Sequence, residues 1–170
     1  APQIAGAAAL FTQFWKDNNS GAYPSPAMIK AAIINTAQEM NGQNTSTSIP
    51  NGNEGWGRIN MKYMLNTGVP MKYVDQTVEL TTVGASVAYE GRVADSTKPT
   101  RISLVWTDPP AALTDSSEAS APALVNNLDL TVEVGGIQYR GNVFTNGSSS
   151  SGGVSDTKNN VENVFLPAGI

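Results

Sequence analysis

The chain opens with Ala1-Pro2-Gln3-Ile4-Ala5-Gly6-Ala7-Ala8-Ala9-Leu10-Phe11, the stretch that decides how its first part folds. The apolar residues recur at spacings of three and four, which predicts a helix with one buried face. The small residues Ala5, Gly6 and Ala9 would let a neighbouring backbone come close. No Ser, Thr, Asp or Asn precedes the helix as an N-cap, although Pro2 suits its first turn. We therefore expect a core helix that further structure covers.

A second helix is predicted after a polar turn. Ser25 is a good N-cap, Pro26 suits the first helical position, and residues 27–37 are apolar on most sides, as in a core helix. Residues 41–54 are rich in Asn, Gly, Ser and Thr and predict a surface loop. The loop leads to Gly55-Trp56-Gly57-Arg58-Ile59-Asn60, where two glycines indicate a tight turn around one buried ring.

These three segments resemble, in order and spacing, the C-terminal part of subtilisin-like serine proteases. The family's nucleophilic serine lies in Gly-Thr-Ser-x-Ala-Ala-Pro-x-(Val/Ile)-(Ala/Ser)-Gly, and Ala1-Pro2 aligns with its Ala-Pro. Residues 26–37 match the pattern Pro-x-x-(Val/Ile)-(Lys/Arg)-x-x-(Leu/Ile)-x-x-Thr-Ala, and residues 55–60 match the Gly-(Tyr/Trp)-Gly-x-(Ile/Val)-(Asn/Asp) segment that closes the protease domain. The resemblance implies a nucleophilic serine three positions upstream of Ala1, with residues 1–70 as the end of the protease domain.

Composition excludes a complete catalytic centre of this kind within the chain, which contains no His and no Cys. No Ser-His or Cys-His pair can form, and no zinc-thiolate site. We therefore predict no catalytic residue here, and the resemblance implies that the Asp-His-Ser triad lies upstream. The net charge of −4 argues against nucleic-acid binding, and no apolar run is long enough to cross a membrane.

From Val69 onward, helical periodicity stops and short alternating runs predict antiparallel strands. The predicted strands are residues 77–81, 86–89, 101–107 and 128–134. Gly135-Gly136 predicts a two-residue hairpin turn leading into residues 137–139. Residues 115–122 and 146–155 are rich in Ser, Gly and Ala and are predicted loops. The expected fold is α then β, with an antiparallel β-sandwich over residues 71–170.

The second half resembles the C-terminal jelly-roll domain of a group of secreted, mostly bacterial subtilases, which is similar in architecture to the P domain of proprotein convertases. The matching segments, in the family's order, are residues 104–109, 124–130, 139–142 and 159–165. In the family a further strand follows the position of Ile170. The resemblance thus implies a chain truncated at both ends, with a sheet edge left unpaired.

Calcium is the cofactor that the sequence suggests. Asp129, Asp156, Asn160 and Glu162 lie in Asn-rich segments and offer the hard oxygen ligands that Ca²⁺ binds. Related β-barrel domains of the family are known for calcium sites. We take Asp129, Asp156 and Asn160 as the candidate metal ligands. The alternative is ordinary turn chemistry, because Asn and Asp side chains also hydrogen-bond to nearby backbone.

These features predict part of a secreted, extracellular subtilisin-like serine endopeptidase, in which this piece packs behind the active site and stabilises the enzyme. The partners would be polypeptide substrates of the parent enzyme and the remainder of the protease domain, with no nucleic acid and no membrane. Two alternatives stay open. In one, the β-sandwich is a non-catalytic module that binds protein or carbohydrate, and in the other it is a calcium-dependent stability element. An isolated chain is expected to expose apolar surface and to be poorly stable or associated.

Overall fold

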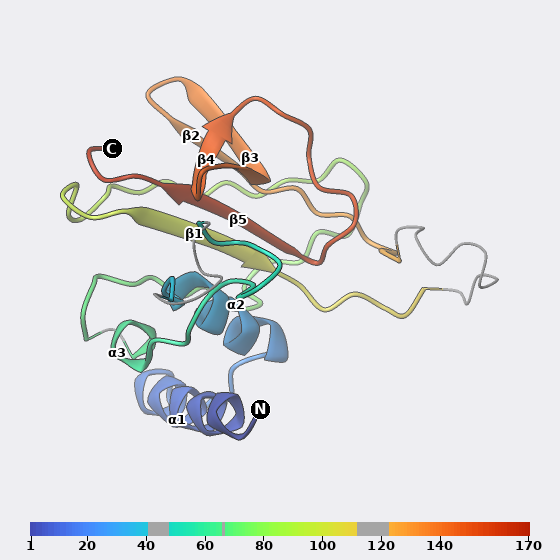
Figure 1. Cartoon of the computed structure of the whole chain (residues 1–170). Coiled ribbons are helices and arrows are strands. Elements are labelled where there is room, and N and C mark those ends of the chain that lie inside the picture. The colour runs from blue at the N-terminus through green and yellow to red at the C-terminus, as the bar shows by residue number, and fades with distance from the viewer. Residues whose placement is uncertain (41–47, 66, 112–122) are drawn as a thin grey trace.

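The fold was analysed in a computed structural model, which describes residues 1–40, 48–65, 67–111 and 123–170. Within these residues, three helices come first and five strands follow (Figure 1). This order confirms the coarse prediction of α then β. The assignment to a subtilisin-type domain and a jelly roll stays a prediction. The predicted loops at residues 41–47 and 115–122 lie outside the described residues.

Helix α1 (Pro2–Asn18) begins without a side-chain cap, as the sequence indicated. Its buried side chains are Ala7, Phe11 and Trp15, which lie at a spacing of four and form one face. The chain leaves the helix through Gly21, whose φ of 82° places it in the left-handed region that suits glycine. The Gly21 N–H donates to the carbonyl oxygen of Lys16 at 2.9 Å and so closes the last turn.

Helix α2 (Pro26–Thr36) confirms both predicted start signals. The Ser25 side chain accepts a hydrogen bond from the Met28 N–H at 2.9 Å, and Pro26 occupies the first turn. Asp75 in turn holds the cap, because its carboxylate accepts from the Ser25 N–H at 2.7 Å and from the Ser25 hydroxyl at 2.6 Å. A residue fifty positions away therefore fixes where α2 begins.

The helical core gathers Phe11, Trp15, Met28, Ala32 and Met64, the last from the short helix α3 (Met61–Met64). Tyr73 closes this cluster. Its ring meets the Phe11 ring edge-on at 5.3 Å between centroids, and its hydroxyl donates to the Met64 carbonyl oxygen at 2.8 Å. Burial raises the pKa of Tyr73 to about 12. The core of the helical layer thus extends past residue 70.

Two antiparallel sheets make up the second half of the chain. In the first, β1 (Thr100–Val105) pairs with β5 (Val161–Leu166), with Thr100 opposite Leu166 and Val105 opposite Val161. The second has the order β2 (Thr131–Val134), β3 (Ile137–Thr145) and β4 (Ser148–Ser151). Gly135 and Gly136 have φ values of 58° and 79°, so the predicted hairpin turn between β2 and β3 is confirmed.

Two predictions about strands were wrong. Residues 77–81 and 86–89 belong to no strand in the described part of the chain, although the Ala85 N–H donates to Thr82 at 3.1 Å in a turn between them. The apolar residues that alternate in these segments could be buried only if another element packed on them, and the described residues supply none. Val78, Leu80, Val87 and Tyr89 are exposed instead.

Part of the predicted loop at residues 146–155 is also strand. Asn146 and Gly147 form a turn with φ values of 51° and 80°, and β4 follows it. Ser149 of β4 is buried, and its hydroxyl oxygen accepts from the Phe165 N–H at 2.9 Å. This strand could not be predicted from an apolar pattern, because it consists of Ser residues and its contact with β5 is a hydrogen bond.

The β1–β5 sheet is the middle layer of the molecule (Figure 1), with α2 on one side and the β2–β3–β4 sheet on the other. Arg101 of β1 joins the helical layer to this sheet. Its guanidinium donates to the carbonyl oxygens of Asn35 and Ala37 at the end of α2 and lies 4.5 Å from the centre of the Phe165 ring. Burial lowers the pKa of Arg101 from its ordinary value.

Candidate functional site

The exposed outward face of α1 carries apolar and small residues in its first half, and polar residues such as Gln13 and Asp17 further along. Ile4 is 43 % exposed and Leu10 58 %, and Ala5 and Ala9 beside them are exposed as well. A methyl group added to Gly6 would meet no atom within 4 Å. No element of the described part of the chain therefore packs against Gly6 on this face. In Figure 1, α1 lies at the edge of the molecule with the other elements on one side of it.

The three candidate metal ligands lie in separate segments of the second half. Asp129 precedes β2, while Asp156 and Asn160 lie in the connection between β4 and β5. Among the described residues, no group of three or more Asp, Glu, His or Cys side chains is placed to hold a metal ion. How each of the three is engaged decides whether calcium is a reasonable expectation.

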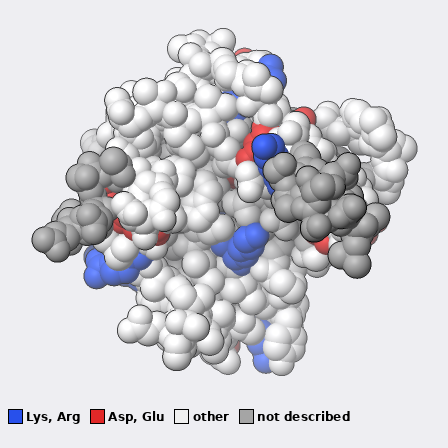
Figure 2. Space-filling view, turned by 45° about the vertical axis from the view of Figure 1, so that its right-hand side comes forward, with Lys and Arg blue, Asp and Glu red and all other residues white. Residues whose placement is uncertain are grey.

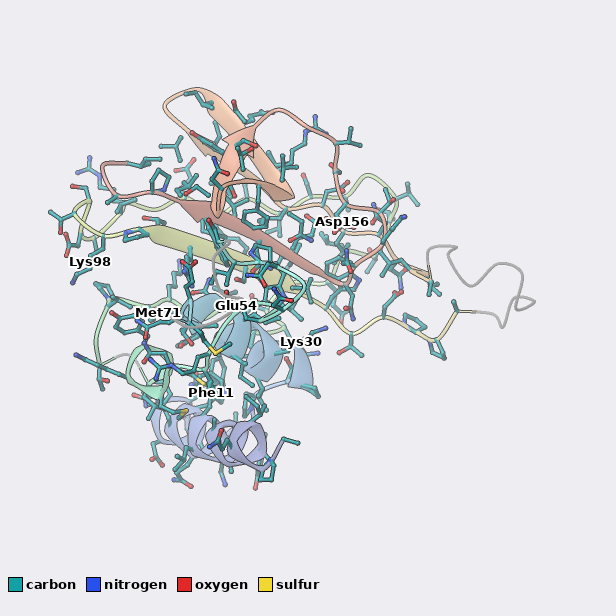
Figure 3. All side chains as sticks on the ribbon, viewed as in Figure 1. Phe11, Lys30, Glu54, Met71, Lys98 and Asp156 are labelled. Carbon is teal, nitrogen blue, oxygen red and sulfur yellow. The ribbon has the colours of Figure 1, made fainter. Side chains whose placement is uncertain are left out.

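Asp156, labelled in Figure 3, is engaged by its own loop and by β3. Its Oδ2 accepts from the Asn142 and Asn159 amides, both at 2.6 Å, and its Oδ1 accepts from the Lys158 and Asn159 N–H groups at 2.8 and 3.2 Å. Burial alone would raise the pKa of Asp156, but these donors hold it below its ordinary value. This is the turn chemistry that the sequence left open as the alternative to a metal.

Asn160 bridges α2 to the middle sheet. Its amide oxygen accepts from the Lys30 ammonium at 3.1 Å, and its amide nitrogen donates to the Trp106 carbonyl oxygen at 3.0 Å. The oxygen that a calcium ion would need thus faces a positive charge. Asp129 makes no hydrogen bond within the described part of the chain, but its negative charge acts on a third carboxyl group, that of Glu162.

Glu162 is a fully buried acid in the middle of β5. Its Oε2 accepts from the Leu130 N–H at 2.6 Å, whereas its buried Oε1 has no hydrogen-bond partner among the described residues. The side chain crosses the backbone of β3 at Gly141, where a methyl group would come within 2.2 Å of Oε2. Burial raises the pKa of Glu162 to about 7 against the effect of the Leu130 N–H, with help from the negative charges of Asp129 and Asp156.

Sequence reasoning named Glu162 as a possible oxygen ligand but did not single it out. The signal was present, because all six residues of β5 are buried and a charged residue in such a strand requires a partner or a shifted pKa. Its neighbour Asn163 has a similar position. Its Oδ1 accepts from the Ser103 hydroxyl and its N–H donates to Asn142, while its buried Nδ2 has no partner among the described residues.

One surface hollow of about 570 Å³ lies where α1 ends, next to residues 75 and 76. Trp15, Tyr23 and Asn19 contribute to its lining. It is open and mostly polar, and no His or Cys contributes to its lining. The surface in Figure 2 is largely uncharged, with Lys, Arg, Asp and Glu scattered over it.

The sequence matches no known family model, and a search of curated proteins also finds no match. Among the described residues, no helix is both long and apolar enough to cross a membrane.

Proposed function

We propose that this chain is part of a secreted subtilisin-like serine endopeptidase, which hydrolyses peptide bonds through an Asp-His-Ser triad lying outside these residues. In this proposal the chain packs behind the active site and stabilises the enzyme. The observation that carries the proposal is the exposed outward face of α1, together with the three sequence motifs that resemble the family. No catalytic role is proposed for any residue of the chain.

The outward face of α1 supports this proposal because Ile4 and Leu10 are exposed together with Ala5 and Ala9, and grouped apolar and small residues suit contact with another element. Because Ile4 and Leu10 are about half exposed, each forgoes roughly half of the about 1.5–3 kcal/mol that full burial of such a side chain provides. Gly6 also weakens a helix by about 1 kcal/mol relative to Ala, a cost that makes sense where another backbone must come close. The remainder of a protease domain is the partner that would cover this face.

The start of α1 fits the same proposal. Ala1 provides no side-chain cap, and its carbonyl oxygen accepts from the Ile4 and Ala5 N–H groups at 3.1 and 3.2 Å. The unpaired N–H groups of a first turn favour negative charge nearby. A serine placed just before this turn would have its developing oxyanion in a favourable field.

The experiment is active-site labelling of the natural material with a fluorophosphonate probe, followed by mass analysis and N-terminal sequencing. A labelled serine on a polypeptide that is joined to this chain or purifies with it supports the proposal. When introduced into the whole protein that carries the labelled serine, Ile4→Asp and Leu10→Asp should each lower peptide hydrolysis at least tenfold, since each puts a charge into the packed face. Val83→Asp, at a fully exposed position outside α1, is the matched control. Unlabelled material, or full hydrolysis in both α1 variants, would overturn the proposal.

Calcium binding in the second half remains a separate proposal, to which the present hydrogen bonds offer little support. Asp156 and Asn160 would have to exchange their donors for the metal, and the Lys30 ammonium would have to move away. Thermal unfolding of the chain in calcium and in a chelator tests this. A higher Tm in calcium, lost in Asp129→Asn, supports the site, and an unchanged Tm leaves Asp156 and Asn160 as hydrogen-bonding residues.

A second candidate function is protein binding by the β-sandwich half. The observation that favours it is the row of exposed side chains Val78, Leu80, Val87 and Tyr89, whose backbone pairs with no described strand. An exposed segment whose backbone is unpaired can take up a strand from a partner. Leu80→Lys and Tyr89→Lys should abolish such binding while leaving hydrolysis by the parent enzyme unchanged. Loss of hydrolysis would instead mean that this segment belongs to the protease assembly.

A further inference from the structure

The hollow at the end of α1 has the size of a small-ligand site. Its volume is about 570 Å³, and pockets that hold small ligands commonly measure about 300–1,000 Å³. Trp15 and the residues that follow α1 line it, and Asp75 and Gln76 join them from a later segment of the chain. Trp15 belongs to the buried face of α1, so the hollow is distinct from the outward face that carries Ile4 and Leu10.

Two amide side chains at the hollow have oxygen atoms that are free to accept hydrogen bonds. The Asn18 Nδ2 donates to the Phe14 carbonyl oxygen at 2.7 Å, and the Asn19 Nδ2 donates to the Trp15 carbonyl oxygen at 2.8 Å. These bonds satisfy carbonyl groups in the last turn of α1 and hold the nitrogen end of each amide. Each Oδ1 accepts no hydrogen bond from the described residues, so it can accept one from a ligand in the hollow.

The hollow also offers donors that have no partner in the described part of the chain. Trp15 is only 8 % exposed, and a buried indole N–H normally has an acceptor. No described residue provides one, and this N–H is not among the fully enclosed unpaired atoms, so a ligand in the hollow can reach it. The exposed amide of Gln76 is also unpaired, and its φ of 43° is a strained backbone conformation that occurs often at ligand sites.

Tyr23 contributes an aromatic ring that is exposed but held in place. Its side chain is 73 % exposed, while the Lys16 ammonium donates to its hydroxyl at 3.2 Å and lies 4.4 Å from the ring centre. A ring fixed in this way loses little freedom when a ligand packs on it. The C–H face of a sugar ring suits such a surface, because its weakly positive hydrogens are attracted to the negative face of the aromatic ring.

The lining of the hollow provides little free charge. Asp75 is its acidic residue, and both of its carboxylate oxygens already accept hydrogen bonds from Ser25. No Lys or Arg is part of the lining. A charged ligand would therefore find no unpaired charge of the opposite sign, whereas a neutral ligand with many hydroxyl groups would match the free amide and indole groups.

We propose that this hollow binds a neutral saccharide. Hydroxyl groups of the sugar donate to the Oδ1 atoms of Asn18 and Asn19 and accept from the Gln76 amide and the Trp15 indole N–H. The apolar face of the sugar ring lies on Tyr23. The inference does not rest on the proposed protease function, because every contact comes from residues of this chain.

The test is an NMR titration of the indole N–H resonances of the whole 170-residue chain. The probes are maltotriose, mannotriose and N,N′-diacetylchitobiose, each up to about 10 mM, which covers the millimolar affinities expected of an open site. The Trp15 resonance should shift with at least one of these sugars, while those of Trp56 and Trp106, which do not line the hollow, should stay in place.

Two variants with a matched control identify the site. Tyr23→Ala should weaken sugar binding at least tenfold. Tyr89→Ala removes another exposed ring beside a Lys ammonium, 5.9 Å from its centre and outside the hollow, and should leave binding unchanged. Gln76→Gly removes the amide and relieves the positive φ, so it should weaken binding without lowering the urea midpoint of unfolding.

Three results would overturn the proposal. In the first, none of the sugars shifts the Trp15 resonance. In the second, Tyr23→Ala binds as the wild type does, or Tyr89→Ala weakens binding as much as Tyr23→Ala. In the third, tetramethylammonium shifts the Trp15 resonance but no sugar does, because the hollow would then be a site for cations.

Discussion

Replacing Arg101 tests how the helical layer is joined to the middle sheet. Arg101→Met keeps an unbranched stem of similar length but removes the donors to Asn35 and Ala37 and the charge above Phe165. Hydrogen bonds to a charged group contribute about 1.5–3 kcal/mol, and a partly desolvated cation–π contact about 1 kcal/mol. Because new apolar contacts of Met offset part of this loss, we expect about 3 kcal/mol of destabilisation.

For a chain of this length, that loss lowers the Tm by roughly 6–12 °C. The measurement is urea unfolding followed by far-UV circular dichroism, with Arg92→Met, at an exposed position, as the control. Arg101→Lys should fall between the two, since a Lys ammonium cannot span both carbonyl oxygens as a planar guanidinium does. If Arg101→Met unfolds within 0.5 kcal/mol of the wild type, roughly the scatter of surface substitutions, the reasoning about this contact is wrong.

Three further results are expected. Ser25→Ala should cost about 1–2 kcal/mol in urea unfolding, because the cap on Met28 is lost and Asp75 loses a donor. Ionisation of Glu162 should lower the free energy of unfolding by at most about 3 kcal/mol, because its pKa is raised from 4.5 to about 7 in the folded chain. This stabilisation is fully present below pH 4.5 and is lost as the pH rises through 7. A series of urea unfolding curves in which stability rises with pH over this range would refute this. Tyr73 should resist ionisation until about pH 12 in absorbance titration of the folded chain, because burial disfavours its charged form.

The features predicted correctly from the sequence are those whose cause is local. The start of α2 needs only Ser25 and Pro26, and the hairpin between β2 and β3 needs only Gly135-Gly136. The wrong predictions depend on distant partners. Alternation at residues 77–81 is compatible with a strand, but a strand forms only where another lies beside it. Residues 148–151 show no apolar pattern, and their pairing follows from the preceding turn and from Ser149 against β5.

The candidate site divides in the same way. Asp156 and Asn160 were chosen for their oxygen chemistry, but neighbours within a few residues, and Lys30 from far away, already occupy those oxygens. Glu162 differs because its burial and its single bond depend on Leu130 and Gly141, which lie more than twenty residues upstream. A pattern of residue types cannot reveal such a pairing until the two sheets are in place.

The exposed stretch at residues 77–93 makes the chain itself vulnerable to cleavage. Exposed chain outside helices and strands is where proteases nick folded proteins first. A cut there would leave Asp75 and the helices on one fragment and β1 to β5 on the other. The fragments would still be held together by Arg101 at the end of α2 and by the bond between Lys30 and Asn160. Limited digestion should therefore give two bands on a denaturing gel from material that still elutes as one particle.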